Sequence, residues 1–314
     1  MTKKRIILDC DPGHDDALAI MLAHGSDELD LLAVTTVSGN QSLQKVTHNA
    51  RVIATVIGMT DVPIAAGADH PLVWAPRFAA DIHGESGLGG PVLVEPTVPL
   101  DGRHAVDLII ETIMDSAPGE ITVIGTGPAT NLALALRREP AIAHRAQSVV
   151  LMGGAHTRGN VTPAAEFNVY ADPHAAAVVL QAPWDVTLIG LDLTHQAGAT
   201  AEVRSRIAAI GTGPSRFTSE LLTFFAAAYE NVQGMLDPPV HDPCAVAYVI
   251  DPGVMTTQPA HVVVELTGEH TTGMTVTDFS ERSGPRDVTV GMVLDRPRFW
   301  DLMTSALVAI GDHP

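Results

Sequence analysis

IILDCDPGHDDAL, residues 6–18, is the stretch around which the chain is organised. Its first three residues are apolar and predict a short buried strand. Pro12 and Gly13 then predict a turn, because proline fixes φ and glycine adopts backbone conformations that other residues avoid. From Asp15 onward, apolar residues recur at helical spacing. The stretch therefore predicts a strand, an acidic turn and a helix, with the acids at the carboxyl end of a strand, where open α/β sheets bind ligands.

Four carboxylates, those of Asp9, Asp11, Asp15 and Asp16, lie close together in this stretch. A helix N-terminus favours one or two acids, which accounts for Asp15 and Asp16 but leaves the other two unexplained. A bound divalent cation would relieve the repulsion among all four. Oxygen ligands favour Ca²⁺ or Mg²⁺ over zinc, and the spacing is not that of an EF-hand loop. The cluster therefore predicts a site for a hard cation.

The chain has 314 residues, of which 46% are hydrophobic, and a net charge of −18. We find no linker, repeat or low-complexity tract, so residues 1–314 are expected to form a single domain. The negative charge, with lysine only at positions 3, 4 and 45, argues against nucleic acid or an anionic membrane as a partner. Cys10 and Cys244 lie in apolar segments and predict buried thiols in a reducing cytoplasm. We expect neither a secretory signal nor a membrane span.

Apolar runs and helical patterns alternate along the chain. Strands are expected at 29–37, 62–66, 121–124, 148–152 and 186–189, and helices at 43–57, 104–116, from 173 and over most of 200–232. This alternation predicts an open, mostly parallel, Rossmann-like α/β sheet flanked by helices, with the active site at the C-terminal edge of the strands. Residues 260–266, 273–277 and 287–293 predict strands that can pair antiparallel at one edge, and residues 297–311 predict a closing helix.

Three further segments carry residues typical of a binding site. Residues 67–90 lack periodicity and are interpreted either as a functional lid or as a disordered insertion. Thr126 lies in a Gly-Thr-Gly-Pro turn after a predicted strand, and Pro128 keeps the residue before it out of the helical region, which leaves backbone carbonyls free for an ion or a ligand. His241 and Asp242 precede an apolar helix, where Asp242 is expected either to cap the helix or to join the site.

The acidic turn resembles the signature of the inosine-uridine nucleoside hydrolases, which cleave the N-glycosidic bond of ribonucleosides. Further motifs occur in that family's order. They are IHGESGL at 82–88, GTGPATNL at 125–132, MGG at 152–154, EFN at 166–168 and VHDP at 240–243. The resemblance covers residues from about 5 to about 305. It implies a hydrolase with an α/β fold that acts in nucleoside salvage.

The resemblance also implies a role for each matched residue. The ligands of one Ca²⁺ would be Asp11, Asp16, Asp242 and the backbone carbonyl of Thr126, with the ribose 2′- and 3′-hydroxyls completing the shell. Asp11 would be the general base for the attacking water, and His241 would be the proton donor or relay to the leaving base. The substrate-binding residues would be Asp15, Asn40, His83, Met152, Asn160, Glu166, Asn168, Phe225, Tyr229 and Asp242. His83 would belong to a loop that closes over the nucleoside, and the protein would be a homotetramer or homodimer.

The residue types suit this chemistry independently. Breaking a ribosyl C–N bond develops positive charge on the sugar, and carboxylates and amide oxygens around the ring stabilise that charge. A poor leaving base also needs a proton, which a histidine can supply. Phe225 stands where several relatives have tyrosine. Phe225 and the retained Tyr229 are therefore interpreted either as nucleobase contacts or as core packing of an apolar helix.

Two other functions compete with this interpretation. A strand followed by Asp-x-Asp is also typical of haloacid-dehalogenase-type phosphatases, but Gly13 replaces their usual Thr or Val, and no lysine follows position 45. The second is a non-catalytic ribose- or calcium-binding protein with the same fold. The complete set of acids and the His241–Asp242 pair argue against it. The sequence therefore predicts an enzyme, a purine or pyrimidine nucleoside hydrolase.

Overall fold

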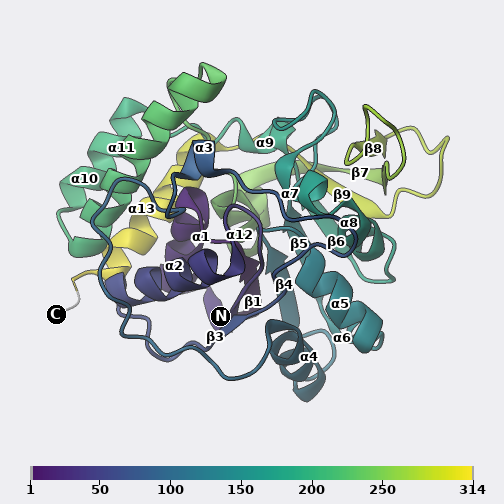
Figure 1. Cartoon of the computed structure of the whole chain (residues 1–314), viewed down its shortest axis with the longest axis horizontal. Helices are drawn as coiled ribbons and strands as arrows, with labels where there is room; N and C mark the ends of the chain where they lie inside the picture. The colour runs from purple at the N-terminus through teal and green to yellow at the C-terminus, as the bar shows by residue number, and fades with distance from the viewer. Residues whose placement is uncertain (1–2, 313–314) are drawn as a thin grey trace.

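The computed structural model describes residues 3–312 and contains one mixed sheet (Figure 1). Its strands within those residues are β1 (Lys4–Cys10), β2 (Leu29–Thr36), β3 (Ile64–Ala66), β4 (Ile121–Gly125), β5 (Ser148–Met152), β6 (Val186–Ile189), β7 (Met255–Val264), β8 (Thr275–Asp278) and β9 (Val288–Leu294). The strand order is β3-β2-β1-β4-β5-β6-β9-β7-β8. All neighbours from β3 to β9 pair in parallel, whereas β7 runs antiparallel to both β9 and β8. The predicted α/β class and the antiparallel edge are both confirmed.

Helices connect the strands and cover both faces of the sheet. The longer helices are α1 (His14–Gly25), α2 (Leu43–Val56), α4 (Ala105–Asp115), α5 (Thr130–Arg138), α8 (Pro173–Leu180), α10 (Ala201–Ile210), α11 (Gly213–Gln233), α12 (Pro243–Ile250) and α13 (Arg296–Ile310). Short ones are α3 (Ala80–His83), α6 (Ile142–Arg145), α7 (Phe167–Ala171), α9 (Leu191–Thr194) and the 3₁₀ turn η1 (Pro252–Val254).

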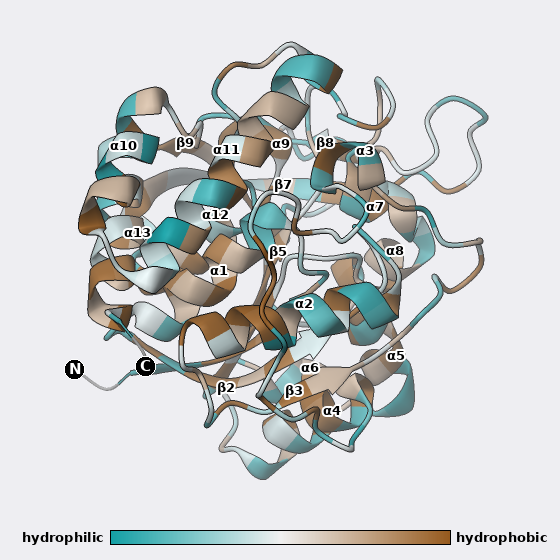
Figure 2. Ribbon diagram, turned by 60° about the vertical axis from the view of Figure 1, so that its left-hand side comes forward, coloured by the Kyte–Doolittle hydropathy of each residue, from teal (hydrophilic) through white to brown (hydrophobic). Residues whose placement is uncertain are grey.

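Each face of the sheet has its own hydrophobic core. Along β1, Ile6 and Leu8 belong to the core that includes buried residues of α1, α2, α12 and α13, whereas Ile7 belongs to the core with α4, α5 and α8. Successive strand residues point to opposite faces, so a continuous apolar run is what a strand covered on both sides requires. Figure 2 shows hydrophobic colours along the central strands and mixed colours on outer helices such as α10.

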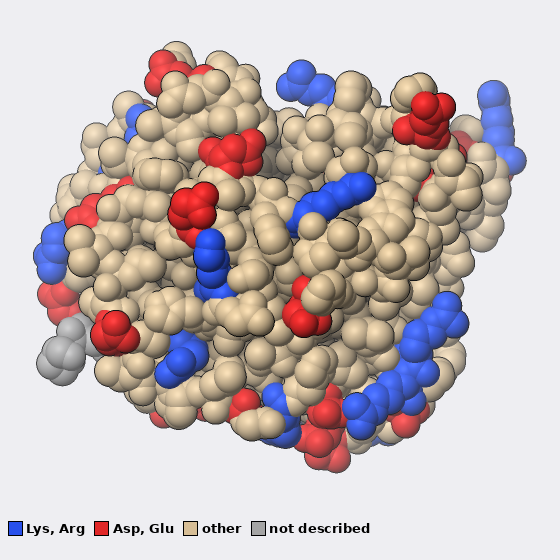
Figure 3. All heavy atoms as spheres, viewed as in Figure 1, with Lys and Arg blue, Asp and Glu red and all other residues tan. Residues whose placement is uncertain are grey.

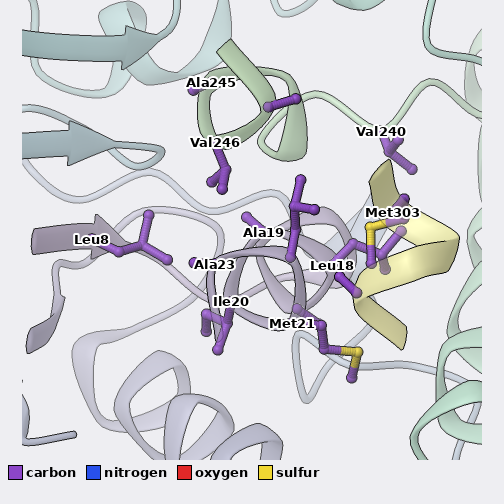
Figure 4. Packing of buried hydrophobic residues seen from close by; sticks show 14 of the residues in the cluster. Leu8, Leu18, Ala19, Ile20, Met21, Ala23, Val240, Ala245, Val246 and Met303 are labelled. Atoms are coloured by element: carbon purple, nitrogen blue, oxygen red, sulfur yellow. The ribbon is translucent and has the colours of Figure 1, made fainter. Parts of the chain in front are cut away.

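Helix α1 lies inside the first of these cores. All of its residues from His14 to Ala23 are buried, as expected for a helix that is apolar all round. Figure 4 shows its side chains directed at Leu8 of β1, Val246 of α12 and Met303 of α13. Because neighbours surround the helix, the position of its N-terminus and of the acids there is fixed by packing rather than by the turn alone.

The strand order places the acidic turn at a topological switch point. From β1 the chain moves to β2 on one side, while β4 lies on the other side of β1. In open α/β sheets a crevice forms where the connections diverge, outside the carboxyl ends of the strands. Asp11 follows β1 and Thr126 follows β4, so both stand at this crevice.

Some local features differ from the sequence-based expectations. The loop at 67–90 contains α3, and the polar stretch at 160–168 runs into α7. Strand β7 begins at Met255 rather than at 260, because its first residues are mostly exposed and give no apolar signal. The helical region 200–232 is two helices, since Gly211 adopts a φ of 79° that ends α10, and the Thr212 side chain then caps α11.

The outer surface adds little to the functional argument. On the face drawn in Figure 3, acidic and basic side chains are scattered singly or in small groups over a largely uncharged surface. Between residues 3 and 312, no helix combines the length and apolarity needed to cross a membrane.

Candidate active site

The turn between β1 and α1 holds its acids in place through backbone amides. Asp16, in the first turn of α1, accepts hydrogen bonds from the Gly13 amide at 3.0 Å and from the Asp11 amide at 3.2 Å. A Cβ at Gly13 would lie 2.5 Å from His83 Nδ1, so only glycine fits there. The predicted strand, turn and helix are confirmed. The interpretation of Asp16 as a helix-start residue accounts for part of these contacts, since Asp16 accepts the Gly13 amide at the start of α1.

Three buried carboxylates converge above this turn. Oxygens of Asp15, Asp16 and Asp242 lie within 4.8 Å of one another. Burial is the largest cause that raises the pKa of each, to about 7 for Asp15, and neighbouring carboxylates raise the pKa values of Asp15 and Asp242 further. Asp242 does not cap α12 with its side chain, so the capping alternative is wrong. A group of like charges this close calls for a cation or for shared protons.

Asp11 adds a fourth carboxylate at the floor. Its Oδ2 accepts a hydrogen bond from the Asn40 amide at 2.6 Å, but its Oδ1 is buried and has no partner among residues 3–312. Buried polar atoms are almost always paired, so an orphaned carboxylate oxygen indicates a missing ligand. The three carboxylates whose oxygens lie within 4.8 Å of one another include Asp15 but not Asp11, although Asp11 was the predicted metal ligand. The donors are all oxygens, and they fit a hard divalent cation.

The turn after β4 completes this floor. Thr126 donates its hydroxyl to Asp16 Oδ1 at 2.9 Å, and its carbonyl accepts a hydrogen bond from Asn168 Nδ2 at 2.7 Å. Asn168 Nδ2 also lies 3.1 Å from the Met152 carbonyl. The Thr126 carbonyl that was predicted to be free therefore accepts a hydrogen bond from the Asn168 side-chain amide, and its second lone pair remains available to an ion.

A cavity of about 380 Å³ opens above these acids. Most of the predicted site residues line it: Asp15, Asn40, His83, Thr126, Met152, Asn160, Glu166, Asn168, Tyr229, His241 and Asp242. Asp11 and Asp16 lie beneath the floor and are fully buried. A pocket that combines apolar walls with convergent polar groups is typical of a small-molecule site.

Glu166 and Asn160 have local structural partners in addition to facing the cavity. The Glu166 carboxylate accepts hydrogen bonds from two backbone N–H groups at the start of α7. They are those of Asn168, at 2.8 Å, and Val169, at 3.1 Å. The Gly154 amide donates a third hydrogen bond to it at 2.9 Å. Asn160 accepts one from the Phe167 amide. Burial raises the pKa of Glu166, and these amides oppose that rise.

His241 is held between two hydroxyls. Its Nδ1 lies 2.7 Å from Thr194 Oγ1 and its Nε2 lies 2.8 Å from the Tyr229 hydroxyl. Its backbone amide donates to Asp15 at 3.2 Å, which links this side of the pocket to the acids. Burial lowers the pKa of His241 to about 3, so the ring is neutral near pH 7. A neutral imidazole with a partner at each nitrogen relays a proton more readily than it starts as an acid.

Phe225 is placed differently from the other predicted residues. Its side chain has no exposed surface, and it does not line the cavity. It packs against Tyr229, with ring centroids 4.8 Å apart, and against His14 at 5.0 Å. The core-packing interpretation therefore describes Phe225, whereas Tyr229 reaches the cavity.

The loop after β3 covers one side of the pocket. Gln41 and Asn49 hold it with hydrogen bonds to the carbonyls of Gly84, at 3.0 Å, and Ser86, at 2.8 Å. Sequence reasoning missed most of its contributions to the lining, and two of them are large side chains. One is Arg77, whose guanidinium lies 4.1 Å from the centre of the Tyr170 ring, and the other is Phe78. Neither lies in a motif with regular spacing, so no sequence signal could have indicated them.

Comparison with known proteins decides the family. A model described as inosine-uridine preferring nucleoside hydrolase matches residues 6–301. The chain belongs to this family. The enzyme of that name from Leishmania major is 53% identical over 98% of this chain and 99% of its own. A pyrimidine-specific ribonucleoside hydrolase of Escherichia coli is 43% identical over 96% of this chain and 97% of its own.

Solved structures agree with the sequence comparisons. The purine-preferring ribonucleoside hydrolase from Gardnerella vaginalis superposes with a TM-score of 0.92 at 32% identity, covering 98% of this chain and 99% of its own. This chain is therefore a nucleoside hydrolase that acts on ribonucleosides. The predicted family and enzyme class are confirmed, and the phosphatase alternative is excluded. Relatives that differ in base preference share the fold, so the fold does not determine which base is preferred.

Proposed function

We propose that this nucleoside hydrolase uses Ca²⁺ to hydrolyse the N-glycosidic bond of ribonucleosides such as inosine and uridine, releasing ribose and the free base for nucleoside salvage. The observation that carries the proposal is the set of buried acids at the cavity: Asp15, Asp16 and Asp242 converge there, and Asp11, which has one unpaired oxygen, interacts electrostatically with all three. A resident cation is the simplest partner for that set of oxygens.

The metal would be held by Asp11, Asp16 and Asp242, with the second lone pair of the Thr126 carbonyl as a further ligand. Asp15 belongs to the three carboxylates whose oxygens lie within 4.8 Å of one another and is the alternative ligand. When bound, Ca²⁺ supplies an anchor for two adjacent sugar hydroxyls and makes a water more acidic. This donor set contains no sulfur or imidazole nitrogen, and it therefore favours Ca²⁺ over zinc.

The protein side chains perform the remaining chemistry. Asp11 takes a proton from the attacking water, because its unpaired Oδ1 has no other hydrogen bond to lose. Asp15, Glu166 and Asn168 bind the ribose hydroxyls and face the positive charge that develops on the sugar. The loop at 67–90 excludes water above them, which strengthens these electrostatic interactions.

The leaving base receives its proton through Tyr229 and His241. The two side chains are hydrogen-bonded at 2.8 Å, and both line the cavity. Since His241 is neutral, it can replace the proton that the Tyr229 hydroxyl passes to the base only if Nδ1 takes up a proton as Nε2 gives one; that proton enters through the Thr194 hydroxyl and comes ultimately from solvent water. This is a relay rather than donation from a preformed imidazolium.

Removing the metal is expected to abolish turnover and lower the Tm. Binding to the native state alone stabilises a protein by mass action, and without the ion the carboxylates repel one another. Release of reducing sugar from uridine and inosine would be measured with EDTA and after Ca²⁺ is restored, beside calorimetry of both forms. An unchanged Tm and unchanged turnover in a protein that carries no ion would contradict the calcium site.

His241→Ala is expected to slow inosine hydrolysis by about 10²–10⁴-fold while sparing Ca²⁺ affinity. The activated substrate p-nitrophenyl riboside leaves as a stable anion and needs no proton, so its rate should fall far less. A kcat series on both substrates checks this, with isothermal titration of Ca²⁺ as the control. Equal losses on both substrates would remove His241 from the leaving-group step.

We also propose that the enzyme works in the cytoplasm as a homotetramer or homodimer, with no nucleic acid or membrane partner. Support for a reducing compartment comes from Cys10 and Cys244, which are buried free thiols. Sedimentation of the purified protein would give the oligomeric state.

A further inference from the structure

Arg77, at the wall of the cavity, has no counter-ion. Among the described residues that line the cavity, it is the only arginine or lysine. It forms no ion pair with a carboxylate of residues 3–312, although the exposed Asp81 lines the same cavity. Its Nη1 is buried and has no hydrogen-bond partner within those residues. Since a guanidinium stays charged in proteins, this positive charge lacks a partner.

Two aromatic rings hold the guanidinium in place. Its central carbon lies over the Trp74 ring, 4.5 Å from the ring centre, and over the Tyr170 ring, 4.1 Å from the centre. The two rings meet at an angle of 79°, with centroids 6.2 Å apart, and so form a corner. An aromatic face attracts a cation but offers no oxygen to its N–H groups. The corner therefore positions the arginine and leaves its donors for another partner.

The missing partner is expected to be an anion. Arginine carries five N–H donors in a planar fork that matches the geometry of a carboxylate or a phosphate. Buried polar atoms are almost always paired, and burying a charge is costly unless a counter-charge compensates it. A neutral carbonyl or hydroxyl would accept from one donor without balancing the charge. The unpaired Nη1 of Arg77 therefore favours a ligand group that is negatively charged.

Arg77 belongs to the side of the cavity that α7 forms. Tyr170, one of the two rings beside the guanidinium, lies one helical turn from Glu166, and its backbone N–H donates to the Glu166 carbonyl at 2.8 Å. Both residues line the cavity. The Glu166 carboxylate accepts three backbone N–H groups and is not a counter-ion of Arg77. Arg77 therefore extends this wall beyond a residue that is proposed to bind the sugar.

One end of the proposed substrate remains for this wall. The acids take the 2′- and 3′-hydroxyls of the ribose, and the leaving base lies beside Tyr229 and His241. In a ribonucleoside, the base and C5′ are carried by the two carbons that flank the ring oxygen, so they extend from opposite ends of the sugar. The group on C5′ is therefore expected to face α7 and the corner that holds Arg77.

We propose that Arg77, held by Trp74 and Tyr170, forms a subsite for a phosphate on C5′, so that ribonucleoside 5′-monophosphates are also substrates. The step is the one proposed for nucleosides. The C1′–N bond breaks, a water oxygen bonds to C1′, the water proton goes to Asp11, and the relay gives the base a proton. The phosphate ester is untouched, so the products are the free base and ribose 5-phosphate. This inference rests on the proposed function for the placement of the ribose.

The test compares uridine, uridine 5′-monophosphate and 5′-O-methyluridine in wild type and in Arg77→Met. Methionine is unbranched and packs well against aromatic rings, but it has neither the charge nor the N–H donors. 5′-O-methyluridine enlarges the group on C5′ without adding charge. Arg137→Met is the matched control, because Arg137 of α5 is exposed and lies outside the cavity. Calorimetry of each variant establishes that it is folded.

Wild type is expected to release uracil from uridine 5′-monophosphate, with ribose 5-phosphate as the other product. Ribose in its place would mean that the phosphate was removed first. In Arg77→Met, kcat/KM for the monophosphate should fall about 10–100-fold more than kcat/KM for uridine, the loss expected when a charged group loses its hydrogen-bonding partner. Arg77→Lys keeps the charge and should recover part of this loss. The ratio between 5′-O-methyluridine and uridine should stay at its wild-type value, and Arg137→Met should change none of the three rates.

A wild-type preparation that hydrolyses uridine but forms no ribose 5-phosphate from the monophosphate would overturn the inference. So would equal losses on both substrates in Arg77→Met, because Arg77 would then only hold the loop at 67–90 against α7. If wild type releases uracil from neither substrate, the proposed function fails. Titration calorimetry of uridine 5′-monophosphate with wild type and Arg77→Met then still decides whether Arg77 binds the phosphate.

Discussion

Uridine is expected to be hydrolysed with a kcat/KM about 10⁴-fold higher than that of 2′-deoxyuridine. The proposed site presents the sugar with buried polar groups, among them the Asp15 carboxylate and the Asn168 amide. When the substrate lacks the 2′-hydroxyl, these groups lose a hydrogen-bond partner and no bulk water replaces it. That loss penalises the analogue far more than a missing apolar contact would. Release of ribose and of deoxyribose by the same protein preparation measures the ratio.

An Asp15→Asn variant tests where this discrimination arises. Asp15 accepts a hydrogen bond from the His241 amide at 3.2 Å, and the oxygen of asparagine can keep that contact. The variant should therefore fold, while the ratio between uridine and 2′-deoxyuridine becomes smaller. Equal kcat/KM values for the two nucleosides in wild type would contradict the sugar-binding model.

Asp11→Asn is expected to lower kcat by about 10²–10⁴-fold, the range typical of losing a general base. The side-chain oxygen of the new asparagine can still accept a hydrogen bond from the Asn40 backbone N–H, as Asp11 Oδ2 does at 2.6 Å. The asparagine side chain cannot, however, take a proton from water. One charge fewer among the buried acids should leave the Tm of the metal-free protein unchanged or higher. Single-turnover hydrolysis of inosine and calorimetry measure the two effects separately.

Asp9→Asn is the matched control for this substitution. Asp9 is similarly buried, but its Oδ1 is paired: it accepts from Thr35 Oγ1 at 2.6 Å and from Asn131 Nδ2 at 2.8 Å, whereas Asp11 Oδ1 has no partner among residues 3–312. Burial raises the pKa of Asp9 to about 7, so a neutral amide is a mild replacement. We expect turnover close to wild type. If Asp11→Asn keeps more than about a tenth of wild-type kcat, general-base catalysis by Asp11 is excluded.

The sheet was predictable wherever a short apolar run ended in a turn. The bounds expected for β5 and β6 coincide with those observed, because both strands are buried along almost their whole length and are apolar except for Ser148 and Thr187. The start of β7 was not predictable in this way, because exposed strand residues resemble loop residues. The break at Gly211 did have a sequence signal, Gly-Thr-Gly-Pro at 211–214, which the expectation of a largely helical 200–232 did not use.

The candidate site was predictable in its acids but not in its surroundings. Asp11, Asp15 and Asp16 share one turn, so their proximity follows from local sequence, and Asp242 followed from the resemblance to the family. The contact between His14 and His83 could not be inferred, because it depends on how residues far apart in sequence meet. The hydrogen bond between the Thr126 carbonyl and Asn168 is of the same kind.

The burial of α1 has a consequence for how the protein is synthesised. Helix α1 is made early, but its packing partners include α12 and α13, which come from the last quarter of the chain. A ribosome adds about 5–20 residues per second. The nascent chain therefore carries its first acids for many seconds before Asp242 and the C-terminal helix emerge. Asp242 joins the carboxylates of Asp15 and Asp16 only when nearly the whole polypeptide is available to enclose them.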